Sequence, residues 1–316
     1  MPVATRYGAD MTPTGAQYAL AHGDQEAIVT ERGASLRSYR VGGRDVVVTY
    51  AETDLPPAFH GALLAPWPNR LRDASYSVEG VVHQLPVTEP DRHNALHGLV
   101  FDLPWRPLSR TASTIVLGLD LEAREGYPFP LRLEAEYALG DEGLQVSVRA
   151  ANAGTRIAPY GIGFHPWLSP GDATVDECVL SVDADHWFRA DERLIPVSVE
   201  PLPADLDFRQ PRVIGSASFD DAFTATMPPG GRSWVRLDSP DGWRAAIWTA
   251  APMTTWQVCT GDFPELGRYA RSGVAAEPMS CPADAFNSGR GLVLLAPGDE
   301  HVARWGLCAD RPGAGR

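Results

Sequence analysis

The sequence predicts an all-β protein, a large antiparallel β-sandwich, and three observations carry this prediction. Apolar and polar residues alternate with a period of two wherever a pattern can be counted, which is typical of strands with one buried face. The chain of 316 residues contains 30 glycines and 28 prolines, too many for a helical bundle. No window of a dozen residues keeps the 3.6-residue period of an amphipathic helix.

Three hairpins carry the clearest alternation. Each joins two runs through a turn rich in Gly, Asp, Ser or Pro, the residue types that tight turns require. In chain order, the predicted hairpins pair residues 38–40 with the apolar run 46–48 through Gly42-Gly43, residues 131–139 with 144–148, and residues 234–237 with 243–249. Further short strands are expected at residues 26–30, 114–120, 178–183 and 292–295.

Strand signals continue at similar spacing along the whole chain. No internal repeat, low-complexity linker or charge block marks a boundary. We therefore expect a single domain over residues 1–316, with an ordered core at about 13–308 and frayed ends, the tail 309–316 among them. The alternative is a division into two domains, because β domains above about 250 residues are unusual.

The charged residues exclude several classes of function. All 27 basic residues are arginines, so chemistry that needs a lysine, such as Schiff-base formation or a P-loop, is not available. A formal net charge of −13 argues against a nucleic-acid partner, which would select a basic surface. A small neutral substrate fits this balance better than a polyanion.

Cysteine usage and the absence of targeting signals predict a cytoplasmic protein. The four cysteines, at positions 178, 259, 281 and 308, show no C-x-x-C spacing, so we expect free thiols in a reducing compartment. The first residues lack the pattern of a signal peptide, and no apolar run approaches the roughly 20 residues that span a bilayer. No membrane partner is expected, and the sequence leaves the oligomeric state open.

Five polar segments combine a chemically active side chain with Gly or Pro, as loops on a rigid β scaffold do. They are residues 66–70, 94–98, 163–167, 219–223 and 277–287. Each alone has a structural explanation. His93 and His97 have the spacing of a zinc helix, but Asn94 stands where that motif needs Glu, so no metal site is expected.

Taken together and in this order, the segments resemble the aldose 1-epimerase (galactose mutarotase) family over residues 20–307. The most specific parts are PNR at 68–70, NALHG at 94–98, DDAF at 220–223 and EPMSCPADAFN at 277–287. GYPFPLRLEAEY at 126–137 and WQVCTGD at 256–262 add to the resemblance. It implies a β-supersandwich with its site in an open cleft of one sheet.

The resemblance also implies a function, the interconversion without a cofactor of the α and β anomers of an aldose such as galactose or glucose. It makes Glu277 the general base, His165 the general acid and His97 a hydrogen-bonding partner at the ring end of the sugar. Arg70 and Asp220 would bind sugar hydroxyls. The same motifs add three further expected sugar contacts, Asn69, Trp167 and Gln257.

These residue types suit mutarotation, because the reaction needs a base at the anomeric hydroxyl and an acid at the ring oxygen. We expect Glu277 to take the O1 proton while His165 protonates O5, which opens the ring. The base would be ionised and the acid protonated together, so activity would fall on both sides of neutral pH. Any one tryptophan is better explained by core packing than by stacking on the sugar.

Two departures from the family pattern leave the sugar open. GFHPWL surrounds the second histidine where many galactose mutarotases have an Asn-His-Ser-Tyr-Phe type of segment, and LVFDLPW follows NALHG in place of a Gly-rich continuation. Both resemble a divergent branch whose sugars vary. A sulfo- or phosphosugar would require arginines that converge on the cleft. The alternatives are a sugar-binding sensor without catalysis and a glycoside hydrolase that uses Glu277 with Asp220 or Asp91.

Overall fold

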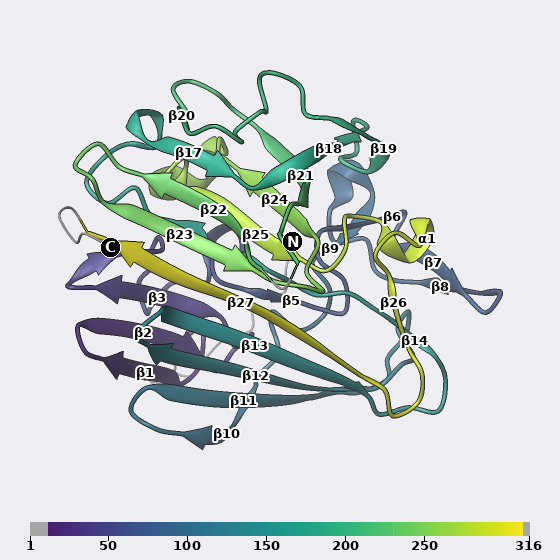
Figure 1. The fold of residues 1–316 in the computed structure, drawn as a ribbon. Coiled ribbons are helices and arrows are strands. Elements are labelled where there is room, and N and C mark those ends of the chain that lie inside the picture. Colours follow the sequence, from purple (N-terminus) through teal and green to yellow (C-terminus); the bar gives the residue numbers. More distant parts are fainter. Residues whose placement is uncertain (1–11, 230, 312–316) are drawn as a thin grey trace.

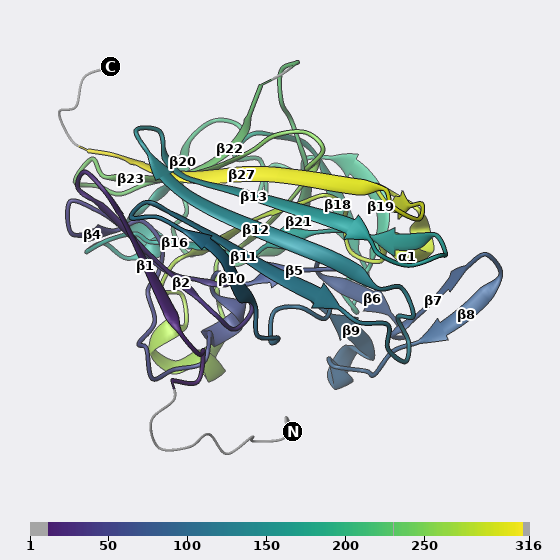
Figure 2. The same ribbon diagram turned by 90° about the horizontal axis from the view of Figure 1, so that it is seen from below.

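The computed structural model describes residues 12–229 and 231–311, and most of them belong to two large antiparallel sheets (Figure 1). The nine-stranded sheet has the order β10 (Arg106–Arg110), β11 (Thr114–Leu121), β12 (Leu131–Gly140), β13 (Gly143–Asn152), β27 (Glu300–Asp310), β23 (Arg244–Thr249), β22 (Ser233–Asp238), β17 (Val179–Val182) and β20 (Arg212–Val213). Figure 2 shows this sheet from below as one broad, twisted layer.

The second sheet has eight strands and carries the pocket described below. Its order is β19 (Pro196–Pro201), β18 (Ala184–Ala190), β21 (Asp220–Ala225), β24 (Thr255–Cys259), β25 (Val274–Met279), β15 (Gly163–Phe164) and β5 (Leu63–Leu64), and β16 (Trp167–Leu168) also pairs with β25. Aromatic side chains join the two layers. The rings of Phe164 and Trp305 stack with centroids 5.2 Å apart, and Trp256 Nε1 donates to Ser233 Oγ at 2.9 Å.

Four small sheets complete the β structure. They contain β1 (Gln17–His22), β2 (Gln25–Thr30), β3 (Leu36–Val41) and β4 (Arg44–Asp45); β14 (Ala158–Tyr160) and β26 (Val293–Leu295); β6 (Arg70–Arg72) and β9 (Asn94–Leu96); and β7 (Ser75–Val78) and β8 (Val81–Gln84). The β7–β8 hairpin projects from the body of the molecule (Figure 2).

Helical segments are short throughout the described residues. They are the 3₁₀ turns η1 (Pro57–Phe59), η2 (Pro90–Arg92), η3 (Val175–Glu177) and η4 (Pro264–Tyr269), and the single-turn helix α1 (Ala285–Ser288). The predicted all-β sandwich is therefore confirmed.

Two predicted hairpins, β12–β13 and β22–β23, are confirmed with the expected turns. The first hairpin differs in part: β3 pairs with Arg44–Asp45, and the apolar run 46–48 reaches β3 only through the Val46 N–H, which donates to the Tyr39 carbonyl at 2.9 Å. Within that run, Val47 forms a single bridge to Leu168, and Val46 is fully buried. Three consecutive apolar residues carry no alternation that could fix their register, so their pairing depends on the rest of the core.

The expectation of frayed ends falls mostly on residues 1–11 and 312–316, which lie outside the described part of the chain. It is wrong for Ala309 and Asp310. These residues continue β27, where they pair with Ala245 and Arg244 of β23. The backbone hydrogen bonds of a long central strand extend beyond the last clear hydrophobic residue, which sequence patterning does not register.

The register of β21, β24 and β25 places the pocket side chains on one face. Gln257 lies opposite Glu277, and Asp220 lies opposite Cys259. Side chains alternate along a strand, so these residues point away from the sandwich core, whereas Trp256 points into it and is fully buried.

Candidate active site

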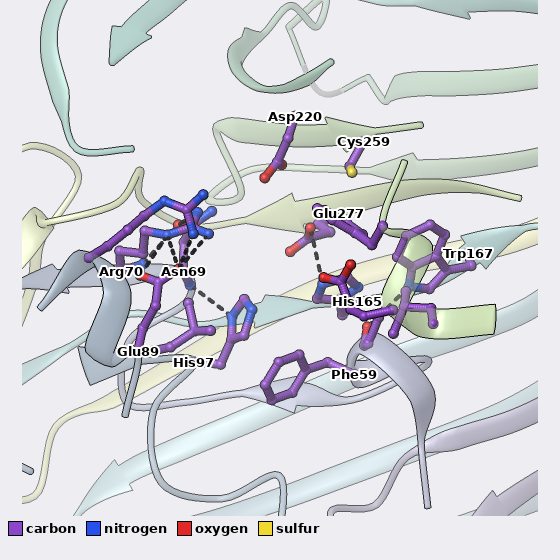
Figure 3. Close-up of a pocket in the computed structure, with 16 residues that line it drawn as sticks. Phe59, Asn69, Arg70, Glu89, His97, His165, Trp167, Asp220, Cys259 and Glu277 are labelled. Carbon is purple, nitrogen blue, oxygen red and sulfur yellow. Dashed lines mark hydrogen bonds and ion pairs between the residues drawn. The ribbon is translucent and has the colours of Figure 1, made fainter. Parts of the chain in front are cut away.

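A pocket of about 260 Å³ opens on the outer face of the eight-stranded sheet (Figure 3). Strands β21, β24 and β25 form its floor, while η1, η4 and the residues after β9 form its walls. Figure 3 shows Arg70 and Glu89 at one side, Trp167 at the other, and His165 and Glu277 between them. Seven of the eight residues expected to bind or transform the sugar line this pocket, so the five motifs do converge. The lining includes Asn69, Arg70, His97, His165, Trp167, Asp220 and Glu277.

His165 and Glu277 form a close pair in the middle of the pocket. His165 Nε2 lies 3.3 Å from Glu277 Oε1, and the two side chains are 9% and 4% exposed. The backbone fixes His165 between β15 and β16, because its carbonyl accepts from the Gly61 N–H at 2.8 Å and its N–H donates to the Ala62 carbonyl at 3.0 Å. Glu277 Oε2 is buried without a hydrogen-bond partner among the described residues.

Burial controls the charge of this pair. It lowers the pKa of His165 from 6.5 to about 3, and the neighbouring His60 adds to the shift. It also raises the pKa of Glu277 well above 4.5, with the charge of Asp220 adding and that of Arg70 opposing. Both shifts penalise the charged form. The structure therefore favours a neutral carboxyl and a neutral imidazole, whereas the sequence analysis expected an ionised base and a protonated acid.

His97 stands beside this pair with a fixed tautomer. Its Nδ1 accepts from the Asn69 N–H at 3.2 Å, and burial holds its pKa well below 6.5, with the charges of His165 and Arg70 adding. A neutral imidazole that accepts at Nδ1 carries its proton on Nε2, so His97 offers one N–H donor. Its ring meets His165 edge to face at 5.3 Å and Phe59 at 4.5 Å.

Arg70 is held in place by a carboxylate. Its Nε donates to both oxygens of Glu89 at 3.1 and 3.0 Å, and its Nη2 donates to Oε1 at 3.0 Å. Both side chains are 12% exposed. Asn69, whose φ is +55°, accepts from the Arg70 N–H at 2.9 Å and from Nη1 at 3.3 Å through Oδ1. The guanidinium is therefore preorganised at the pocket wall.

Asn69, Gln257 and Asp220 form a hydrogen-bonded chain along the floor. Asn69 Nδ2 donates to Gln257 Oε1 at 3.2 Å, and Gln257 Nε2 donates to Asp220 Oδ1 at 2.6 Å. Gln257 is only 5% exposed and lines a small cavity together with Asn69, Arg70 and Asp220. A contact between Gln257 and the sugar stays a prediction. The Gln257 amide orients the two neighbours that do line the pocket.

Trp167 lines the pocket but does not present a face to it. The ring is 1% exposed and stacks on His60 at 4.8 Å and on His165 at 5.9 Å. Its Nε1 donates to the Ala58 carbonyl at 3.3 Å. The ring thus forms a wall behind His165, and a contact between Trp167 and the sugar stays a prediction. Trp256 belongs to the core, as core packing predicts.

Several pocket residues escaped the sequence analysis. Phe59 is half-buried against His97 and offers the aromatic surface that Trp167 does not. Nothing in the local pattern marks it, because it reaches the pocket through the irregular turn η1. Glu89 and Arg92 also line the pocket, just upstream of NALHG. A charged group next to a functional motif is the signal that could have found them.

Among residues 12–229 and 231–311, no group of three or more His, Cys, Asp or Glu side chains lies close enough to hold a metal ion. No helix in this part of the chain is long and apolar enough to cross a bilayer.

A large β-sandwich with a buried imidazole–carboxyl pair, an arginine and an aspartate in one pocket defines a class of proteins, the sugar epimerases of the β-sandwich type. Within that class the chain belongs to the aldose 1-epimerase family, whose model matches residues 16–307.

Relatives of known sequence and structure agree with this assignment. The chain is 32% identical to YihR of Escherichia coli (strain K12) over 92% of both proteins. It is 28% identical to the galactose mutarotase of Mus musculus over 81% of both. A GalM/aldose epimerase homologue from C. elegans superposes with a TM-score of 0.82 at 17% identity, covering 93% of this chain and 98% of that one. A putative aldose 1-epimerase from Escherichia coli K12 gives 0.80 at 23% identity, over 93% and 99%.

Proposed function

We propose that the protein is a cofactor-independent aldose 1-epimerase that interconverts the α and β anomers of a hexose such as galactose or glucose. One observation carries the proposal: the pocket holds one buried carboxyl and one buried imidazole 3.3 Å apart. Mutarotation needs one proton acceptor and one proton donor at neighbouring oxygens, and this pair supplies both with a single shared proton.

The reaction begins with the placement of that proton. It passes across the short contact from Glu277 Oε1 to His165 Nε2, which leaves a carboxylate and an imidazolium with unchanged net charge. Glu277 then takes the proton of the anomeric hydroxyl, and the C1–O1 bond of the sugar becomes a carbonyl. The C1–O5 bond breaks and O5 receives the proton of His165. Rotation about C1–C2 and reversal of these transfers give the other anomer.

Four neighbouring groups would hold the sugar during the rotation. His97 offers the Nε2–H that its Asn69 contact leaves free, and Arg70 offers its remaining N–H groups. Asp220 accepts a sugar hydroxyl. The half-buried ring of Phe59 covers the apolar face of the sugar. Each group is held by a second contact of its own, so orientation costs little on binding.

The direct test follows anomer exchange of D-glucose and D-galactose by NMR with and without the protein. We expect exchange well above the spontaneous rate for at least one of the two sugars. A protein that binds sugar but leaves the spontaneous rate unchanged would be a sensor. Release of the aglycone from a nitrophenyl glycoside would favour a hydrolase.

We also place the reaction in the cytoplasm. Cys178, Cys259 and Cys281 form no disulfide and are buried. Free thiols are typical of proteins in a reducing compartment.

A further inference from the structure

The charges that line the pocket are unequal. The cationic side chains among the described lining residues are Arg70 and Arg92. The acidic ones are Glu89, Asp220, Glu265 and Glu277, and of these Glu277 is kept neutral by burial, which raises its pKa well above 4.5. A pocket with this balance attracts an uncharged ligand or a cation more readily than an anion.

Glu89 forms ion pairs with both of these arginines. Besides the three bonds from Arg70, its Oε1 accepts from Arg92 Nη1 at 3.1 Å and its Oε2 accepts from Asn94 Nδ2 at 2.9 Å. Burial alone would raise the pKa of Glu89, but the hydrogen bonds and charge of Arg70 outweigh it and lower the pKa below 4.5. Glu89 is therefore an ionised carboxylate at the pocket wall.

The geometry of Arg70 makes this neutralisation selective. A carboxylate, sulfonate or phosphate binds arginine most strongly through two parallel N–H groups, the fork that Nε and one Nη form. In Arg70 that fork is occupied by Glu89. What remains is one N–H each on Nη1 and Nη2, on a guanidinium whose charge Glu89 already neutralises. An anionic substituent bound there would lie beside the Glu89 carboxylate and be repelled by it, whereas a neutral hydroxyl would not.

We propose that Glu89 is the specificity-determining residue that restricts this site to uncharged aldoses and excludes aldoses with an anionic substituent. The inference rests on the proposed function and names its substrate class. Glu89 acts through Arg70 and Arg92, so it is a positioning residue and not a catalytic one.

The experiment compares sugars that differ only at C6. D-Glucose and D-galactose carry a hydroxymethyl group there, and D-glucuronate and D-galacturonate carry a carboxylate. Anomer exchange gives kcat/KM for each sugar, and calorimetry gives its affinity. For the wild type, kcat/KM for each uronate should be at least about tenfold below that of the matched hexose. The reason is the repulsion between the uronate carboxylate and the nearby Glu89 carboxylate.

Glu89→Gln keeps the shape of the side chain and removes its charge. The ratio of uronate to hexose kcat/KM should rise by roughly tenfold. For the hexose itself, KM should rise several-fold while kcat changes little, because Arg70 loses its orientation and the proton-transfer pair does not. Salt should reduce the uronate effect only weakly, because ions screen a largely buried charge less than an exposed one.

Two further variants separate Glu89 from pocket charge in general. Glu265→Gln removes one negative charge from the exposed rim of the same pocket, and it should move the ratio by less than about threefold. Arg92→Gln removes a cation that is 41% exposed, and it should lower the ratio further, opposite in sign to Glu89→Gln. Arg92→Gln also keeps the inference testable if Glu89→Gln does not fold.

The possible results test the role of Glu89 in charge selection separately from the epimerase activity. A wild type that exchanges or binds uronates as well as hexoses overturns the inference and leaves the epimerase activity standing. Equal shifts in Glu89→Gln and Glu265→Gln also overturn it. Selective binding of hexoses without exchange overturns the epimerase and leaves the charge selection. Binding of none of the four sugars overturns the inference.

Discussion

Glu277 is the residue whose replacement should separate binding from turnover. Glu277→Gln keeps a polar group 3.3 Å from His165 but cannot take the O1 proton. Loss of a general base costs on the order of 10²–10⁴ in rate, so we expect anomer exchange to fall by about 10³ while calorimetry still detects the sugar. Glu122→Gln, at an exposed position outside the pocket, is the control. Retained turnover in Glu277→Gln would remove Glu277 as the base.

The dependence of kcat/KM on pH should show how many protons His165 and Glu277 hold together. Activity needs one proton on His165 and Glu277 together, so it is lost when a second proton binds and when the only proton leaves. The first limb follows the lowered pKa of His165, about 3, and the second follows the raised pKa of Glu277. We therefore expect kcat/KM to stay high as pH falls through 6.5 and to decline only as the pH approaches the lowered pKa of His165, about 3.

The same measurement has a clear contrary outcome. An acid limb centred near 6.5, the ordinary value for histidine, would mean that burial does not set the charge of His165. Exchange rates must be corrected for the spontaneous reaction at each pH. A folding check by circular dichroism separates titration of the pair from acid unfolding.

For single residues, the sequence predicted which side chains meet in the pocket better than it predicted what each of them contacts. The motifs identified His165, Glu277, His97, Arg70 and Asp220, because catalytic residue types stood beside Gly or Pro in loops. Which face of a ring is free, or which amide lies behind a carboxylate, depends on neighbours far away in the sequence. Those long-range contacts decide how Trp167 and Gln257 lie at the site.

At the scale of elements, the loop after β9 depends on one glycine. Gly98 has a φ of +74°, and a Cβ added there would lie 2.2 Å from the Ala65 carbonyl oxygen, which is backbone and cannot yield cheaply. Gly80 in the β7–β8 turn has nearly the same φ, +76°, with nothing within 4 Å. The two positions therefore share the backbone strain and differ in the clash.

Gly98→Ala should cost more stability than Gly80→Ala for that reason. We expect the free energy of unfolding to fall by about 1 kcal/mol in Gly80→Ala and by about 3 kcal/mol or more in Gly98→Ala. Urea denaturation measures both. The sugar affinity of Gly98→Ala should also fall, since His97 precedes the altered backbone. Equal losses in the two variants would show that the contact with Ala65 carries no energy.

Elements with regular alternation were the ones that sequence could predict. The ten-residue strands β12 and β13 each bury one face, so their pattern fixed both type and register. Elements of two or three residues, such as β5, β15 and β16, carry too few positions for a pattern. They nevertheless position His165, and they form only because the sandwich beneath them supplies partners.

For the whole molecule, buried histidines couple stability to pH. Burial lowers the pKa values of His60 to about 4 and His165 to about 3, and it also lowers those of His97, His83 and His301. The unfolded chain binds these protons near pH 6.5 and the folded chain does not, so the free energy of unfolding falls as pH drops below 6.5. Glu277, with its raised pKa, contributes with the opposite sign.

His60 isolates one contribution to this slope. It stacks on Trp167 at 4.8 Å and donates through Nδ1 to the Pro57 carbonyl, so His60→Phe keeps the stack and removes the titrating group. Between about pH 6 and pH 4, a fully buried histidine contributes up to about 1.4 kcal/mol per pH unit. We expect the variant to lose up to that much of the slope in chemical denaturation at successive pH values. His186→Phe, an exposed position, is the matched control. An equal change of slope in both variants would place the acid sensitivity outside the buried histidines.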